Sequence, residues 1–299
     1  MIAKYPKFTP VDIKLKTQIN KYNDSFIPYS DFNFTSLLAW NTNKDTEVSL
    51  LNNNLVIKLP SYTTGKTTYS LLGINNIDES INTLLELSPT LEMVPETVVN
   101  EIDNRQILSI KPDRNNFDYI YRVSKLARMA GKDYKKKRNK ANTFIKAQTG
   151  VELNIQHLSE VSPKITNEIV ELDKIWAKQT KQPAKEAKFE RQAIQNILDN
   201  FSNLNCTITV IHVDDRLVAF SINEVLSGEY AICHFEKALK IHHQHIYTFL
   251  AREVAKDLHQ KGCVHVNWEQ DLGISGIRRS KKSYNPTQML KKYTISKRS

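Results

Sequence analysis

The sequence predicts a mixed α/β (α+β) protein of two lobes, and three observations support this fold class. Runs with alternating apolar residues, such as 206–213, are typical of strands. A longer segment, 162–180, carries apolar residues at helical spacing behind a serine that can cap a helix. The pattern becomes more regular after Gly150, so we expect an N-terminal lobe over 1–150 and a C-terminal lobe over 151–299.

The first half of the chain is predicted to mix short strands with short helices. Glycine, proline and acidic residues mark the turns and the helix starts between them. We expect strands at 55–59, 69–73 and 117–122, helices at 80–87 and 97–102, and two helices within 124–147 that Gly131 separates.

The second half is predicted to form a sheet with helices between its strands. Asp214-Asp215 and Ser227-Gly228 supply turns between antiparallel strands, and Gly262 ends a long amphipathic helix. We expect strands at 151–158, 206–213, 216–226 and 229–236, helices at 162–180, 188–204 and 244–261, and then a strand, a basic helix at 274–284 and a closing strand within 264–293 that completes this lobe.

Composition excludes several classes of protein. With 40% hydrophobic and 25% charged residues the chain is globular, and it has neither a signal peptide pattern nor an apolar run that could span a membrane. Three isolated cysteines, Cys206, Cys233 and Cys263, lie in apolar surroundings and are expected to be buried thiols, as in a reducing cytoplasm. The histidines near 242–245 lack metal-ligand spacing, so we expect no metal site.

The net charge of +10 is concentrated in two zones. Residues 122–146 contain ten Lys or Arg and one acidic residue, and 271–299 contain eight and one. Two focused basic zones favour an anionic partner: nucleic acid, a phosphorylated cofactor or acidic lipid headgroups. The alternative is that both basic helices are only solvated.

Each basic zone places cations where a helix should pack. In the helix at 274–284, Ile274, Ile277 and Tyr284 form an apolar stripe that contains Lys281, with Arg278 at its edge. A lysine that faces inward must extend to the surface, pair with a carboxylate or hold a ligand.

The same arrangement is predicted in the longer helix after Gly131. Tyr134, Ala141 and Ile145 form its stripe, with Phe144 at the edge, and the stripe contains or borders two cations. We therefore expect cations from both halves to line a single pocket beside acidic strand ends. These cations are Lys137, Arg138, Arg278 and Lys281. Structural ion pairs remain the alternative.

Four segments carry a resemblance to a known family. The predicted order of elements after Gly150 resembles the GNAT acyltransferase fold. GKDYKKKRNKANTF at 131–144, HFEKA at 234–238 and NWEQDLGISGIRRSKKSY at 267–284 are similar to the phosphatidylglycerol lysyltransferase C-terminal domain family, as is SDFNFTSLLAW at 30–40. The resemblance implies two tandem GNAT-like lobes with the reaction centre in the second. It also implies transfer of an aminoacyl group from a charged tRNA to a lipid headgroup, as in the best understood members.

One departure bears on the donor. CoA-dependent GNAT enzymes bind the CoA pyrophosphate with a glycine-containing loop at a helix N-terminus. The corresponding segment here, 237–250, has no glycine. We therefore expect no cofactor and favour aminoacyl-tRNA as donor, with tRNA held through its backbone and a lipid headgroup or other small molecule as acceptor. The alternatives are a CoA-dependent N-acyltransferase and a non-catalytic anion-binding protein.

The chemistry needs a base, donors to an oxyanion and groups that position the substrates. Glu236 or Asp271 is the predicted general base, with Glu269 in the same carboxylate cluster, and Tyr284 could protonate the leaving hydroxyl. The predicted substrate-binding residues are Lys137, Arg138, Arg278, Lys281 and Trp268. The competing explanation is a structural network in which these acids and cations pair. Location is expected to be cytoplasmic, with peripheral attachment to the membrane left open.

Overall fold

The computed structural model describes residues 1–60, 65–227, 229–240 and 244–298. The chain forms two compact units, and each is assembled from separate stretches. Unit 1 comprises Met1–Tyr119, Glu269–Arg278 and Met289–Ser299. Unit 2 comprises Ile120–Trp268 and Arg279–Gln288. The chain therefore passes from one unit to the other at residue 120 and not near Gly150, and its C-terminal strand returns to unit 1.

Unit 1 contains a seven-stranded sheet with the order β1-β2-β3-β4-β5-β14-β6. Neighbouring strands are antiparallel except β4 and β5. Its strands are β1 (Thr9–Pro10), β2 (Glu47–Leu51), β3 (Asn54–Pro60), β4 (Thr67–Leu72), β5 (Thr90–Pro95), β6 (Leu108–Pro112) and β14 (Lys292–Lys297). Its helices are α1 (Lys16–Asn23), α2 (Phe34–Trp40), α3 (Ile77–Leu87) and α4 (Glu96–Asn100).

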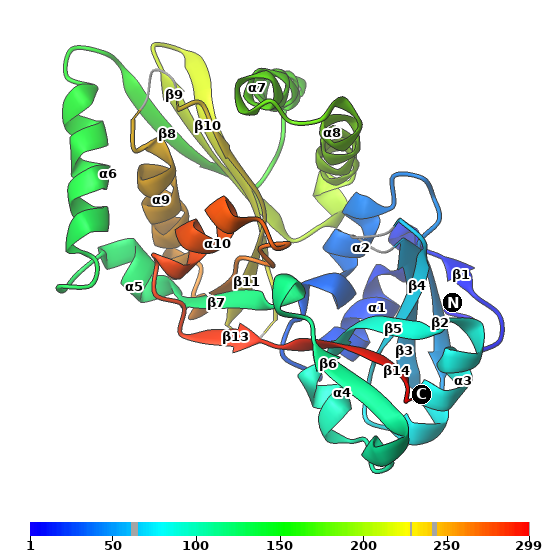
Figure 1. The fold of residues 1–299 in the computed structure, drawn as a ribbon. Coiled ribbons are helices and arrows are strands. Elements are labelled where there is room, and N and C mark those ends of the chain that lie inside the picture. The colour runs from blue at the N-terminus through cyan, green and yellow to red at the C-terminus, as the bar shows by residue number, and fades with distance from the viewer. Residues whose placement is uncertain (61–64, 228, 241–243, 299) are drawn as a thin grey trace. The chain divides into compact units, whose positions relative to one another are not determined.

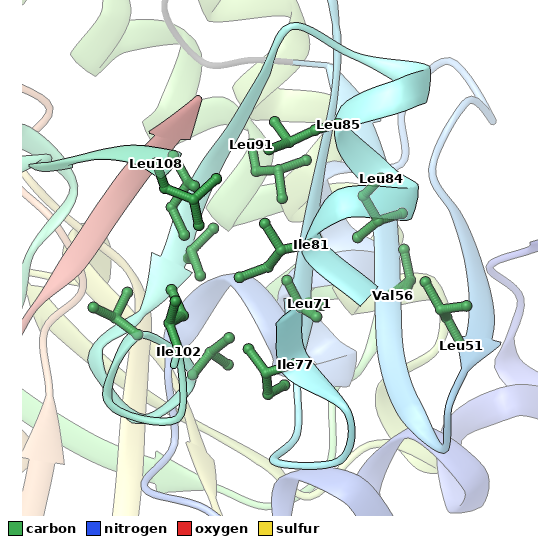
Figure 2. Packing of buried hydrophobic residues seen from close by; sticks show 14 residues of the cluster. Leu51, Val56, Leu71, Ile77, Ile81, Leu84, Leu85, Leu91, Ile102 and Leu108 are labelled. Carbon is green, nitrogen blue, oxygen red and sulfur yellow. The ribbon is translucent and has the colours of Figure 1, made fainter. Parts of the chain in front are cut away.

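The core of unit 1 lies between this sheet and α3 (Figure 2). Ile77, Ile81 and Leu84 recur at helical spacing, so all three point to the sheet and are buried. They pack against strand residues that include Val56 and Leu71. Each such side chain contributes about 1.5–3 kcal/mol through removal from water, so this cluster holds α3 on the sheet.

Unit 2 is built on a second seven-stranded sheet with the order β13-β7-β12-β11-β10-β9-β8. β11 and β12 are parallel, and the other pairs among β7–β12 are antiparallel. Its strands are β7 (Asp118–Arg122), β8 (Leu153–Leu158), β9 (Cys206–Val213), β10 (Arg216–Val225), β11 (Tyr230–Ala238), β12 (His265–Asn267) and β13 (Gln288–Leu290). Its helices are α5 (Val123–Arg128), α6 (Lys135–Ala147), α7 (Pro163–Thr180), α8 (Ala184–Asp199), α9 (Ile246–Gln260) and α10 (Ser275–Lys282), the last of which begins in unit 1.

Helices cover both faces of the β8–β11 strands, with α9 and α6 on one side and α7 and α8 on the other (Figure 1). The Phe144 ring of α6 stacks on Phe249 of α9, with centroids 4.7 Å apart. On the opposite side, α7 begins where the Ser162 side chain accepts a hydrogen bond from the backbone N–H of Ile165. Packing on both faces buries the whole of β9 and most of β10.

The end of β11 directs two charged neighbours to opposite sides of the sheet. The β10–β11 register shifts at Ile222/Asn223, shortly before Glu236 and Lys237. Successive strand residues point to opposite faces. Lys237 accordingly reaches Asp173 of α7, whereas Glu236 is influenced by Lys137 of α6.

Most of the predicted elements are confirmed, including the two helices within 124–147 and all strands from 151 to 236. Three expectations were wrong. The closing strand is in two parts, and β14 joins the sheet of unit 1 between β5 and β6. In the apolar stripe predicted for 274–284, Ile274 and Ile277 are 51% and 39% exposed, so only Tyr284 of that stripe packs. In α6, Ile145 is 40% exposed, and the neighbouring Phe144 is the residue that packs in its place.

The three cysteines are free and buried, as predicted. Across the described part of the chain, no helix combines the length and the apolarity that crossing a bilayer requires. Those same residues include no group of three or more His, Cys, Asp or Glu side chains arranged to hold a metal ion. His242 and His243, which entered the metal prediction, lie outside the described residues.

Candidate active site

Glu236 is the ionisable side chain around which the candidate active site of unit 2 is built. It lies near the end of β11 and is partly buried. Burial raises the pKa of its carboxyl to about 7, against the opposing influence of Lys281 and Lys137. In the part of the chain that the structure describes, this carboxylate forms no hydrogen bond and no ion pair. An acid with a pKa near neutrality can take up or release a proton at physiological pH.

Lys137 supplies the first cation beside Glu236. Burial, reinforced by repulsion from Lys140, lowers its pKa to about 8, while attraction to Glu236 acts the other way. Its Nζ donates a hydrogen bond to Ser283 Oγ at 2.6 Å and lies 3.4 Å from the centroid of the Tyr284 ring. The inward orientation predicted for Lys137 is thus explained by a cation–π contact over a buried tyrosine.

Lys281 supplies the second cation. Its Nζ donates to the carbonyl oxygen of Trp268, and its own carbonyl accepts a 2.8 Å hydrogen bond from the Tyr121 hydroxyl. The Trp268 ring lies 4.5 Å from the ring of Tyr121 and 5.1 Å from that of Tyr284. These aromatic side chains hold the C-terminal end of α10 against β7 and β12, so the charge of Lys281 is fixed in place.

Tyr284, two residues after the end of α10, closes the site. Burial raises the pKa of its phenol, and the hydroxyl donates to Thr248 Oγ1 of α9 at 3.4 Å. Its carbonyl accepts a 2.7 Å hydrogen bond from Tyr134, the residue before α6. The phenol therefore stays protonated at physiological pH and remains available as a proton donor.

Arg138, predicted to bind substrate, has a structural role in this structure. Its guanidinium donates to the carbonyl oxygen of Met129 at 2.6 Å. Met129 is the C-cap of α5 and adopts a left-handed conformation. Arg138 thus satisfies a carbonyl at the end of α5 and stabilises the turn between the two helices.

Asp271 and Arg278 belong to a saturated network in unit 1. The Asp271 carboxylate accepts hydrogen bonds from Arg278 at 2.7 and 2.9 Å, from Tyr119 at 2.6 Å, from Arg114 at 3.1 Å and from the Gly273 N–H at 2.9 Å. Burial alone would raise its pKa, but these donors outweigh burial and lower the pKa to about 2. A carboxylate held so firmly in its ionised form is a weak base.

The four predicted cations are therefore not equivalent. Lys137 and Lys281 act on Glu236 within unit 2, Arg138 caps a helix, and Arg278 pairs with Asp271 in unit 1. Glu269, predicted to join a carboxylate cluster, lies in unit 1 with a left-handed backbone, and its carbonyl accepts a hydrogen bond from the Tyr119 N–H.

Two buried lysines escaped the sequence analysis. Lys237 lies 2.5 Å from Asp173 and 2.9 Å from Glu190, with its Nζ 4.0 Å from the Trp176 ring centroid. The available signal was a lysine inside a strand that is mostly apolar.

Lys292 of β14 pairs with Asp31 and lies 2.8 Å from Asp118. Burial raises the pKa of Asp31 to about 6, and Lys292 opposes this effect. Asp31 belongs to the segment 30–40 that carries part of the family resemblance, and Asn33 of the same segment caps α2 through Ser36 N–H. The resemblance carried by this segment thus has a structural explanation in unit 1.

The family model described as "Phosphatidylglycerol lysyltransferase, C-terminal" matches residues 26–296. The chain belongs to this family. Its resemblance to the family, first seen in four short segments, is confirmed over almost the whole length. The family and the fold are those of acyltransferases.

Solved structures similar to this member of the phosphatidylglycerol lysyltransferase C-terminal family confirm its mixed α/β fold class, with two mixed sheets flanked by helices. A conserved protein of unknown function from Bacteroides thetaiotaomicron VPI-5482 is 25% identical, with a TM-score of 0.83 and full coverage of both chains. L-PGS from Bacillus licheniformis is 12% identical, with a TM-score of 0.64 over 100% of this chain and 95% of that one. FemX is 7% identical, with a TM-score of 0.60 over 98% and 97%.

A curated relative is known only as an uncharacterised protein of Mycoplasmoides gallisepticum. It is 23% identical over 185 residues, which are 60% of this chain. The match covers 55% of that protein, so this chain spans about half the length of its curated relative.

Proposed function

We propose that the family member transfers an aminoacyl group from aminoacyl-tRNA to a lipid headgroup or another small acceptor, with Glu236 as general base. The observation that carries this proposal is the state of Glu236: partly buried, without a hydrogen-bonding partner among the described residues, and with a pKa of about 7. Buried carboxylates such as Asp31, Asp118 and Asp173 form ion pairs with buried lysines. A carboxylate without such a pair among the described residues, beside two cations, therefore points to chemistry.

The proposed reaction is attack on an ester. The Glu236 carboxylate takes the proton of the acceptor's amine or hydroxyl, and the acceptor oxygen or nitrogen forms a bond to the aminoacyl carbonyl carbon. Negative charge develops on the carbonyl oxygen, where Lys137 and Lys281 supply positive potential. The ester bond to the ribose oxygen then breaks, and that oxygen takes a proton from Tyr284 or from the protonated Glu236.

Glu236 is preferred to Asp271 because a base must be able to accept a proton near pH 7. The pKa of Asp271 is lowered to about 2 by its arginine and tyrosine partners, whereas that of Glu236 is raised to about 7 by burial. The pKa of the acid conjugate to an efficient base lies near the working pH. The CoA-dependent alternative lacks support from the 237–250 segment, which has no glycine to admit a pyrophosphate.

Glu236→Gln tests the proposal against Glu229→Gln as a matched control. Glu229 is exposed and directly precedes β11, so the control makes the same chemical change outside the site. Purified wild type is incubated with a set of radiolabelled aminoacyl-tRNAs and extracted phospholipids or small amines, and labelled product is counted. We expect transfer by wild type and by Glu229→Gln, and a loss of about 100-fold or more in Glu236→Gln.

Three results would reject the proposal. Wild type that transfers no label from any aminoacyl-tRNA but acylates amines with acetyl-CoA would establish the CoA-dependent alternative. Full activity in Glu236→Gln would remove Glu236 as base. Absence of transfer from both donors, combined with tight binding of anions, would favour a non-catalytic anion-binding protein.

A further inference from the structure

Helix α9 begins with a tyrosine whose oxygen is held by donors from two other elements. Tyr247 is the second residue of α9 and is partly buried. Its hydroxyl oxygen accepts a 2.6 Å hydrogen bond from Nε1 of Trp176 in α7, and the direction of this bond is fixed because an indole N–H can only donate. The backbone N–H of Ala238, the last residue of β11, donates to the same oxygen. The phenol oxygen is therefore fixed between a helix and the end of a strand.

The proton of the Tyr247 hydroxyl is not used within the described structure. Its two donors occupy lone pairs of the oxygen, and no described residue accepts a hydrogen bond from this hydroxyl. The buried tyrosines of unit 2 differ, because each donates its hydroxyl proton to another group of the protein. They are Tyr121, Tyr134 and Tyr284. Tyr247 thus combines an anchored oxygen with an O–H that points away from both donors.

Tyr247 lies near the candidate base. Ala238 follows Glu236 by two residues in β11, so their side chains point to the same face of the sheet. Burial raises the pKa of Tyr247 to about 12, and the charge of Glu236 acts in the same direction. The phenol is therefore protonated at physiological pH, and it is a hydrogen-bond donor within reach of the electric field of the carboxylate.

The buried lysine of β11 supports the tryptophan that holds Tyr247. The Nζ of Lys237 lies 4.0 Å from the centroid of the Trp176 ring. Its ion pairs with Asp173 of α7 and Glu190 of α8 keep the ammonium group in that place. A cation held over the ring restrains the indole, so the N–H of Trp176 stays directed at the phenol oxygen. The buried ion pairs accordingly fix the position of a hydroxyl at the end of β11.

The oxyanion of the proposed reaction needs a donor of fixed geometry. Lys137 and Lys281 supply positive charge near Glu236, and each already donates a hydrogen bond within the protein. A donor that is preorganised stabilises developing negative charge at little cost of reorganisation, and tyrosine hydroxyls can serve in this way. The hydroxyl of Tyr247 is both preorganised and uncommitted among the described residues.

We propose that the Tyr247 hydroxyl donates a hydrogen bond to the carbonyl oxygen of the acyl group under attack, and that Trp176 positions this hydroxyl. The inference rests on the proposed acyl transfer at Glu236. As the acceptor forms its bond to the carbonyl carbon, the carbonyl π electrons move to the oxygen, and Tyr247 stabilises them without giving up its proton. The electron pair re-forms the carbonyl as the bond to the leaving oxygen breaks, so Tyr247 ends the reaction unchanged.

Tyr247→Phe removes the hydroxyl and keeps the ring, and Tyr230→Phe is its matched control. Tyr230 begins β11, is also partly buried and likewise has no described partner for its hydroxyl. Steady-state transfer to an amine or lipid acceptor is measured for wild type and both variants, from aminoacyl-tRNA and separately from acetyl-CoA, over a range of pH. Thermal melting checks that each variant folds.

We expect Tyr247→Phe to lower kcat about 100-fold, as removal of one oxyanion donor does. Its KM should stay within about twofold of wild type, because the interaction strengthens only as charge develops in the transition state. Both limbs of the pH profile should keep their midpoints, since Glu236 and Lys137 are retained. Tyr230→Phe should match wild type in kcat, KM and pH profile.

Trp176→Phe tests the positioning role on its own. The substitution removes the N–H that holds the phenol oxygen and keeps an aromatic ring beside Lys237. We expect kcat to fall about tenfold with KM unchanged, because the Tyr247 hydroxyl loses its fixed geometry. If Tyr247→Phe does not fold, this variant decides the matter, and an unchanged kcat overturns the inference.

The outcomes separate this inference from the proposed function. An active wild type with equal kcat in Tyr247→Phe and Tyr230→Phe overturns the oxyanion donor and leaves the transferase intact. A loss confined to KM also overturns it, since the hydroxyl would then bind the ground state. If wild type uses acetyl-CoA and not aminoacyl-tRNA, the proposed donor is rejected, whereas a kcat about 100-fold lower in Tyr247→Phe with acetyl-CoA retains the inference.

Discussion

Asp271 in unit 1 and Glu236 in unit 2 are both acidic side chains withdrawn from water, and their surroundings are opposite. Asp271 accepts five hydrogen bonds, three of them from arginine side chains, and its pKa is lowered to about 2. Glu236 has no such partner in the described structure, and burial raises its pKa to about 7. The sequence predicted either one as the base, and only the surrounding donors distinguish them.

The difference indicates that structural charged groups in this protein have their hydrogen bonds and ion pairs filled, whereas the candidate reactive group does not. Buried lysines follow the same rule in both units: Lys292 meets Asp31 and Asp118, and Lys237 meets Asp173 and Glu190. Such pairs are costly to break because the remaining charge stays buried. Glu236, by contrast, retains a desolvation cost that Lys281 and Lys137 offset only in part, which is the pattern expected of a site kept for chemistry.

The largest effect is expected from Asp271→Asn, which should lower the free energy of unfolding by roughly 2–4 kcal/mol at pH 7, because several charged donors lose their acceptor. Since the folded pKa of Asp271 is lowered, its stabilising effect is present above the unfolded value of 3.8 and is lost as pH falls towards about 2. Urea unfolding of wild type and variant between pH 2 and pH 7 measures the difference.

Asp103→Asn is the control for this substitution. Asp103 is exposed in unit 1, so its change should stay within about 0.5 kcal/mol of wild type. If Asp271→Asn changed the free energy of unfolding at pH 7 as little as this control, the hydrogen-bonded network would not be stabilising. Asp271 would then not be a structural carboxylate, and its contrast with Glu236 would fail.

Glu236→Gln should change stability in the opposite direction. The folded pKa of about 7 exceeds the unfolded value of 4.5, so wild type loses stability as pH rises between these values. At pH 8 the variant should therefore be more stable by roughly 1–3 kcal/mol, and near pH 4.5 the two should be almost equal. Unfolding by urea at both pH values tests this. A variant less stable than wild type at pH 8 would mean that the carboxylate has a stabilising partner.

Lys137→Arg should produce the smallest effect, visible in the pH profile of kcat/KM. In wild type, activity should rise with pH as Glu236 loses its proton near 7 and fall as Lys137 loses its proton near 8. Arginine remains charged, so the descending limb should move above pH 9 while the ascending limb stays. At pH 9, kcat/KM divided by its maximum value should be about tenfold higher in the variant than in wild type. An unchanged descending limb would exclude Lys137 from the reaction.

Local patterns predicted the elements well where both packing and turns were visible in the sequence. The β9–β11 strands are bounded by clear turns. The predicted stripe of Tyr134, Ala141 and Ile145, with Phe144 at its edge, identified the buried side of α6 except at Ile145, which is exposed. The strand β14 was assigned to the wrong lobe, because its partners β5 and β6 lie about 180–200 residues away and hydrogen bonding between strands leaves no local signal.

Part of the candidate site was selected from the sequence. Glu236, Lys137, Lys281 and Tyr284 were all selected from the sequence, and they interact within unit 2. Which carboxylate lacks hydrogen-bond donors could not be predicted, because two of the partners of Asp271, Arg114 and Tyr119, are more than 150 positions away in the chain. Similarly, the capping role of Arg138 depends on a turn geometry at Met129 that no periodicity reveals.

Titration of Glu236 tests the contrast most directly. Wild type labelled with 13C at glutamate and aspartate side-chain carboxyls is followed by NMR between pH 2 and pH 9, and Glu236→Gln and Asp271→Asn identify the two signals. A midpoint near 7 for Glu236 is expected, with Asp271 ionised down to about pH 2. A Glu236 midpoint at the ordinary 4.5 would contradict the account, because the carboxylate would then be solvated or paired and unsuited to act as the base.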